Sequence, residues 1–118
     1  MNKTFAATMF LAVAALTAPA LAHTKVQTTS IADGARLERA PANITLTFTR
    51  ATGLTGVALA NVRGAPVPMT YRPPANFGRS FTIMLPPVPP GEYKLSWRAI
   101  ARDGHAVPDA VTFTVVGN

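Results

Sequence analysis

Apolar and polar residues alternate in several short segments of the chain. In residues 44–49, Ile44, Leu46 and Phe48 alternate with three threonines. Neighbouring side chains of a β-strand point to opposite faces, so this segment predicts a strand with one apolar face and one hydroxyl-bearing face. The same pattern in strand-forming residues predicts further strands at 57–62, 81–85, 93–98 and 111–115, and weaker ones near 25–29 and 67–71.

Turn-forming residues separate these segments, and no apolar stripe with helical spacing follows residue 22. The chain has 11 prolines, which disfavour helices and suit loops. Short strands at this spacing predict an all-β fold: an antiparallel β-sandwich or small barrel of about seven strands, with two sheets packed over one core. The turn signals are Asp33-Gly34, 63–66, 73–76, 86–91 and Asp103-Gly104.

The first 22 residues have a different character. A basic start at residues 1–3 precedes an apolar run at 5–18, and an Ala-Leu-Ala tripeptide follows Pro19. This order is typical of a cleaved secretory signal peptide, and it favours that interpretation of residues 1–22 over an uncleaved anchor or a buried core helix. Cleavage after the tripeptide would leave one domain, residues 23–118, in the periplasm, with His23 as its first residue.

The composition narrows the class of protein. Hydrophobic residues make up 48% of the chain and charged residues 14%, so the chain can bury a core and is not a disordered tail. It has no cysteine, which excludes disulfides, thiolate metal sites and a blue-copper centre. The formal charge is +6, but the arginines are scattered singly and do not cluster with aromatic residues, which argues against nucleic-acid binding.

The two histidines, His23 and His105, are the clearest candidates for a metal site. As an N-terminal residue, His23 would offer both its amine and a ring nitrogen to one ion. In Asp103-Gly104-His105, the glycine permits a turn that brings a carboxylate and an imidazole together. An amine, two imidazoles and a carboxylate form a ligand set that suits one tetragonal Cu(II) per chain. Each feature also has a simpler explanation, since a histidine can follow a cleavage site by chance and Asp-Gly is a common turn.

Together with further motifs, these candidate ligands resemble the CopC family of periplasmic copper-resistance proteins over the whole of residues 23–118. The resemblance implies an immunoglobulin-like or cupredoxin-like Greek-key sandwich whose Cu(II) ligands are His23, Asp103 and His105. It rests on the His23 start, on 30–35 and 40–41, on 46–49, 90–93 and 112–115, and on Trp97-Arg98 leading into the Asp103-Gly104-His105 segment.

The resemblance also implies a function. The protein would be a monomer and not an enzyme, and it would sequester Cu(II) in the periplasm for copper resistance or homeostasis. It would deliver the ion to an inner-membrane copper transporter of the CopD type or to another periplasmic copper protein. Because the amine and the imidazoles must lose protons to bind the metal, its affinity should fall as the pH drops.

Several positions depart from the family pattern or bear on it. Some members carry a methionine-rich loop with an extra histidine for Cu(I), whereas the mature chain has only Met69 and Met84, so we expect no Cu(I) site. Met84 lies in an apolar strand and is expected to fill the core. Many members have an acidic residue where this chain has Arg50, so a carboxylate contact from that position is absent. Trp97 and Tyr93 are expected in the core, with Trp97 a candidate apolar support behind the ligands.

Two functions from other classes stay open. A terminal histidine with a second histidine also forms the copper centre of polysaccharide monooxygenases, but one Trp and two Tyr are few for a sugar-stacking surface, and Asp103 would occupy a position that oxygen chemistry needs open. The other is a metal-free β-sandwich module for adhesion or assembly. Serine, cysteine or paired-carboxylate catalysis is not supported, because His105 is the only non-terminal histidine of the mature chain.

Overall fold

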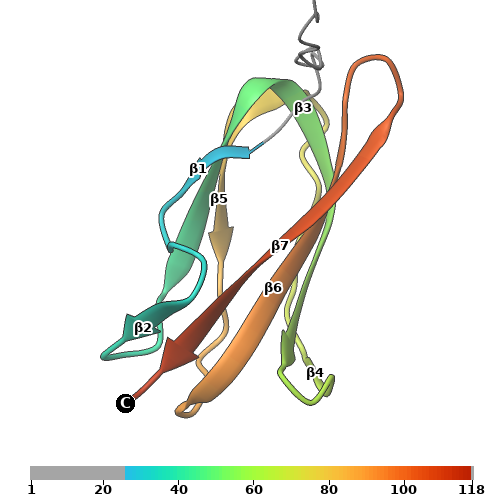
Figure 1. Cartoon of the computed structure of the whole chain (residues 1–118). Helices are drawn as coiled ribbons and strands as arrows, with labels where there is room; N and C mark the ends of the chain where they lie inside the picture. The colour runs from blue at the N-terminus through green and yellow to red at the C-terminus, as the bar shows by residue number, and fades with distance from the viewer. Residues whose placement is uncertain (1–25, 118) are drawn as a thin grey trace, which may run out of the picture.

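The chain forms two β-sheets that share one long strand (Figure 1). The computed structural model describes residues 26–117, and the predicted signal peptide lies outside this range. Between residues 26 and 117 there is no helix, and hence none that could cross a membrane. The strands are β1 (Val26–Thr29), β2 (Ala35–Leu37), β3 (Asn43–Asn61), β4 (Pro66–Val67), β5 (Gly78–Met84), β6 (Gly91–Ile100) and β7 (Ala106–Val115).

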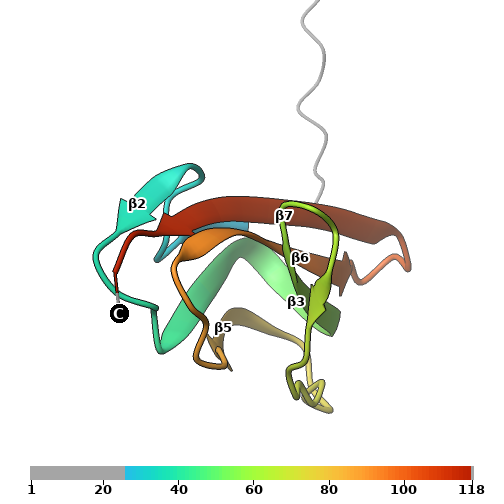
Figure 2. The same ribbon diagram turned by 90° about the horizontal axis from the view of Figure 1, so that it is seen from below.

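Strand β3 is 19 residues long and passes from one sheet into the other. Its first half lies between β1 and β5, with Leu46 opposite Phe81. Its second half pairs with β4 and β6, with Leu59 opposite Leu95, and β7 and β2 continue this second sheet. Figures 1 and 2 show β3 arching over to connect the two layers.

The pairing of β3 is irregular where it changes sheets. Register shifts occur between Thr47 and Thr52 on the side of β5, and between Leu54 and Gly56 on the side of β6. Thr52 is fully buried at the bend, and its hydroxyl donates a hydrogen bond of 2.8 Å to the carbonyl of Arg50. The polar side chain inside the bend is therefore satisfied.

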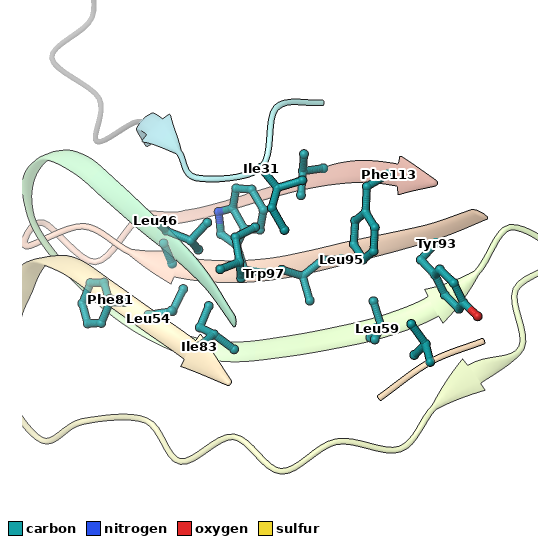
Figure 3. Packing of buried hydrophobic residues seen from close by; sticks show 14 of the residues in the cluster. Ile31, Leu46, Leu54, Leu59, Phe81, Ile83, Tyr93, Leu95, Trp97 and Phe113 are labelled. Carbon is teal, nitrogen blue, oxygen red and sulfur yellow. The ribbon is translucent and has the colours of Figure 1, made fainter. Parts of the chain in front are cut away.

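The core lies between the two sheets and is built from alternate residues of the strands (Figure 3). In β6 the inward residues include Leu95 and Trp97, which is 4% exposed, while their sequence neighbours face outward. Aromatic rings pack together on neighbouring strands of one sheet: Phe48 of β3 meets Phe81 of β5 edge to face, with ring centroids 5.9 Å apart. This alternation confirms the β-sandwich that the sequence predicts, including the buried positions of Trp97 and Tyr93.

The turn between β1 and β2 is tied to the distant strand β7. Asp33 Oδ1 accepts hydrogen bonds from the backbone N–H of Thr112 at 2.8 Å and from its hydroxyl at 3.0 Å, and the N–H of Gly34 donates to the Thr112 carbonyl at 2.7 Å. The two bonds from Thr112, the backbone one foremost, hold the pKa of Asp33 below its ordinary value of 3.8. They keep β2 beside β7, where the two strands pair in parallel with Ala35 opposite Phe113.

Two details of the strands differ from the sequence pattern. The segments 44–49 and 57–62 are parts of the single strand β3, because residues between them continue the ladder through the bend. Strand β2 has only three residues and shows no alternation long enough to predict it. Its parallel pairing with β7 is the one exception to otherwise antiparallel neighbours in the described residues.

The expected core position of Met84 is wrong. Phe81 and Ile83 are the buried residues of β5, so the period of two places Met84 on the outer face, where it is 64% exposed. It lies opposite Asn43 at the start of β3. Met69, by contrast, is partly buried and packs against the core.

Candidate metal centre

The loop between β6 and β7 carries two of the three predicted ligands, Asp103 and His105. Two backbone hydrogen bonds of 2.9 Å close it, from the N–H of Ala101 to the carbonyl of His105 and from the N–H of Gly104 to the carbonyl of Ala101. Gly104 has a φ of +92°, a conformation that side chains with a Cβ seldom adopt, so glycine permits this turn. The structure thus brings a carboxylate and an imidazole together, as the sequence predicts.

The side chains of Asp103 and His105 contact each other directly. His105 Nδ1 lies 2.9 Å from Asp103 Oδ2, and the backbone N–H of His105 donates to Asp103 Oδ1 at 3.0 Å. Hydrogen bonds from the backbone and then the ring of His105 are the main causes that hold the pKa of Asp103 below its ordinary value of 3.8. An ionised carboxylate only accepts hydrogen bonds, so Nδ1 of His105 carries the proton of this hydrogen bond.

Both side chains of the pair face the solvent. The exposed fraction is 72% for the His105 side chain and 62% for that of Asp103. Within residues 26–117, no group of three or more His, Asp or Glu side chains forms a ready metal site. The described part of the chain therefore supplies two adjacent candidate ligands, and the third predicted ligand, His23, lies outside the described residues.

The bend of β3 brings the start of β1 and the end of β6 to the same end of the sandwich. Val26, the first residue of β1, pairs with Phe48, and Ile100, the last residue of β6, pairs with Gly53. Both partners flank the bend, and in Figure 1 the start of β1 and the β6–β7 loop lie toward the top of the molecule. Arg50 is exposed in the same bend.

Arg102 of this loop and Phe77 outside it make a contact that the sequence does not single out. The guanidinium carbon of Arg102 lies 5.2 Å from the centroid of the Phe77 ring, within the range of a cation–π contact. Phe77 in turn packs on Gly53, where an added Cβ would come within 2.9 Å of the ring. A glycine inside a strand is a signal of close approach by another group, and Gly53 is the one clue in the sequence to this packing.

Comparisons with known proteins bear on both the fold and the family. The CopC domain profile matches residues 26–116. Copper resistance protein C of Pseudomonas syringae pv. tomato is 33% identical over 126 aligned positions, which span 98% of each chain.

Two crystal structures resemble the fold. CopC from Methylosinus trichosporium OB3b superposes with a TM-score of 0.68 at 21% identity, over 81% of this chain and 96% of that one, and this likeness shows the fold alone. PcoC, a methionine-rich copper resistance protein from Escherichia coli, superposes with a TM-score of 0.61 at 27% identity, over 80% of this chain and 99% of that one. The domain match over most of the chain and the relative of full length show that this chain belongs to the CopC family.

Proposed function

We propose that this protein binds one Cu(II) ion in the periplasm and carries it for copper resistance or homeostasis, without catalysing a reaction. The observation that carries the proposal is the exposed Asp103–His105 pair, at the end of the sandwich where β1 begins. His23 precedes Val26 by three residues, and an extended chain of that length spans about 10 Å. The predicted N-terminal ligand is therefore tethered close to the strand that enters this end of the fold.

The hydrogen bond between the two side chains assigns roles to their atoms. Because Nδ1 of His105 faces Asp103, we assign metal binding to Nε2 of the same ring. A carboxylate that holds a ligating imidazole in one orientation is a common support of metal sites. In the described loop the carboxylate lies on the Nδ1 side of the ring, so Asp103 would contribute an oxygen to the same copper ion by turning away from Nδ1 when the metal binds. With the amine and ring of His23, this set offers the nitrogen and oxygen donors that suit tetragonal Cu(II).

The related proteins support copper as the metal. The relative from Pseudomonas syringae is a copper resistance protein, and it aligns with nearly the whole of this chain. The relative from Escherichia coli is methionine-rich, whereas this chain has four methionines. Met69 packs against the core and Met84 lies on the outer face of β5, so these two thioethers do not face one site. The donors at the β6–β7 loop favour Cu(II) over Cu(I).

The aromatic residues argue against the rival oxidative enzyme. A polysaccharide-binding surface needs exposed aromatic rings, but Trp97 is 4% exposed and Tyr93 is 5% exposed. Tyr71 is half-buried, and its hydroxyl donates a hydrogen bond of 2.9 Å to the carbonyl of Leu54. The one tryptophan and both tyrosines therefore serve the fold. A copper carrier needs no such surface.

Delivery follows from the exposure of the site. Ligands on an open loop can be reached by the binding site of another protein, so the ion can be passed on by exchange of ligands. We propose an inner-membrane copper transporter of the CopD type, or another periplasmic copper protein, as the recipient. The protein would act on its own as a monomer.

A Cu(II) titration of protein that begins at His23 tests the proposal. We expect one Cu(II) per chain and an electron paramagnetic resonance (EPR) spectrum of a tetragonal site rich in nitrogen. His105→Ala should weaken binding more than about 100-fold, because it removes a ligand, whereas Met84→Ala, on an outer face away from the loop, serves as the matched control. Absence of binding by the processed protein would favour the metal-free module, and oxidised sugars in an assay with copper and a reductant would favour the enzyme.

A further inference from the structure

The internal hydrogen bonds of the β6–β7 loop fix its shape but not its place on the sandwich. The bonds that close it join Ala101, Gly104 and His105 to one another, and the carboxylate of Asp103 also bonds within the loop. Two ligands on a loop that swings freely would meet a third ligand from another segment only part of the time. A two-segment metal site therefore needs a contact that holds the loop against the body of the protein.

Arg102 makes such a contact. It is the loop residue just before Asp103, and its guanidinium lies over the Phe77 ring. Phe77 comes directly before β5, whose first residue, Gly78, pairs with Thr52 in the bend of β3. The ring is thus anchored by the strand that follows it, and it offers the loop a fixed surface to rest on.

The other neighbour of Phe77 shows that its place is specific. The ring packs so closely on Gly53 that an added Cβ would lie 2.9, 3.3 and 3.4 Å from three ring carbons. Gly53 pairs with Ile100, the last residue of β6, so the ring covers the point where the loop leaves the sheet. Phe77 is still 40% exposed, which is unusual for a phenylalanine that serves only the core.

We propose that Phe77, packed on Gly53 and beneath Arg102, is a positioning residue that holds the Asp103–His105 loop in place for metal binding. This role rests on the proposed copper site, because it concerns the same ligands. The bend of β3 links both sides of that site: the ring sits beside Gly53, and β1, which follows His23, begins opposite Phe48. Phe77 thus sets the loop at a defined place relative to the strand that carries the third predicted ligand.

Four variants test this role. Phe77→Leu removes the ring, Arg102→Gln removes the cation above it, and Gly53→Ala displaces the ring without changing it. Phe77→Tyr keeps an aromatic ring at this position and should therefore behave like the wild type. Arg63→Gln is the matched control for Arg102→Gln, since it removes an exposed arginine from the turn between β3 and β4, at the opposite end of the sandwich (Figure 1). Arg102→Gln changes only an exposed side chain, so it carries the test even if Phe77→Leu disturbs folding.

Two readouts separate this role from the proposed function. In copper-free protein, hydrogen exchange at the amides of Ala101 and Gly104 should speed up about two- to fivefold in Phe77→Leu, Gly53→Ala and Arg102→Gln, the range expected for loss of one cation–π contact. In Cu(II)-loaded protein, the same variants should release the ion faster by a similar factor and show an altered EPR spectrum. Phe77→Tyr and Arg63→Gln should match the wild type in both.

Unchanged exchange in Phe77→Leu and Arg102→Gln would overturn the positioning role, whether or not the protein binds copper. Faster hydrogen exchange with an unchanged EPR spectrum and an unchanged rate of copper release would also overturn the positioning role, because the position of the loop would then not affect metal binding. If the wild type bound no Cu(II) while exchange still rose, the proposed copper site would fail, and Phe77 would stand as a support of the loop alone.

Discussion

The fold uses the same dipeptide, Asp-Gly, in two places with different results. Gly34 and Gly104 have φ angles of +83° and +92°, and the carboxylate before each glycine is exposed and has a lowered pKa. Asp33 bonds to Thr112, 79 residues away in sequence, and so ties β7 to the turn before β2. Asp103 bonds to His105, only two residues away.

This difference separates stability from function. A carboxylate that bonds to a distant segment restrains the fold as a whole. One that bonds within its own loop orients the neighbouring side chain and does not connect the strands of the sheets. The Asp33 turn is expected to matter for the free energy of unfolding, and the Asp103 turn for the metal. Substitutions at the two sites should therefore have opposite consequences, and the following experiments test that contrast from the largest effect to the smallest.

Asp103→Ala should have the largest effect. It should weaken copper binding and leave the stability of the fold nearly unchanged. Loss of this carboxylate removes a proposed ligand and the group that orients His105, so the affinity for Cu(II) should drop about 100-fold. The midpoint of thermal unfolding, Tm, should stay within about 2 °C of the wild type, since the bonds lost lie within one exposed loop. Calorimetric titration measures the copper affinity, and thermal melts measure Tm. A large fall in Tm would show that the loop supports the fold.

Asp33→Ala should show the reverse. It leaves the backbone N–H and the hydroxyl of Thr112 without their acceptor and frees the turn before β2, so Tm should fall by about 5 °C. Copper affinity should match the wild type, because the hydrogen bonds of the Asp33 side chain go to Thr112 in β7 and not to the proposed ligands. A copper affinity that fell together with Tm would contradict the separation of the two regions.

The two regions should also respond to acid at different pH values. A lowered pKa means that ionised Asp33 stabilises the folded state at neutral pH, and that this contribution is lost as the pH falls through a folded-state value below 3.8. Copper binding should weaken already as the pH falls from neutral toward 5, because protons compete with the metal for the terminal amine and the imidazoles. Thermal melts from neutral pH into acid measure the contribution of Asp33 to stability, with Asp33→Asn as the control that removes the titrating group. Cu(II) titrations between neutral pH and pH 5 measure the pH dependence of copper binding. An unchanged copper affinity over that interval would count against the ligand set.

The glycines should give the smallest effects. A Cβ at Gly34 or Gly104 meets no atom within 4 Å, so alanine adds only backbone strain, of about 1 kcal/mol. Gly34→Ala and Gly104→Ala should each lower the free energy of unfolding by about that amount. Only Gly104→Ala should also weaken copper binding, by about fivefold, because it distorts the turn between the ligands. Denaturant melts and titrations check these values. An equal loss of copper affinity in both variants would erase the contrast.

The sequence predicts most of the fold because most strands alternate. The alternation fails at residues 50–56, where an arginine, small residues and two glycines separate two predicted strands, yet the chain stays extended and crosses between the sheets. That path is fixed by pairing with β5 on one side and β6 on the other, which is tertiary information. Met84 shows the same limit, since a one-residue change of register moves a side chain from the core to the surface.

The site is predictable to a similar degree. Asp103 and His105 stand two residues apart, so their contact follows from local geometry and is readable from the motif. Phe77 and Arg102 are 25 positions apart by number, and their contact exists only because β5 and β6 flank the same bend of β3. Nothing local in either segment predicts it. The membership of His23 in the site stays a prediction, because that residue lies outside the described residues.

The most direct test of the account concerns that N-terminal ligand. Cu(II) affinity and EPR spectra should be compared between protein that begins at His23 and protein with one extra residue before it, which converts the amine into an amide. The account predicts that the native form binds one Cu(II) in a tetragonal site rich in nitrogen, and that the extended form binds far more weakly with a changed spectrum. Equal affinities and identical spectra would show that the amine is not a ligand and would contradict the proposed centre.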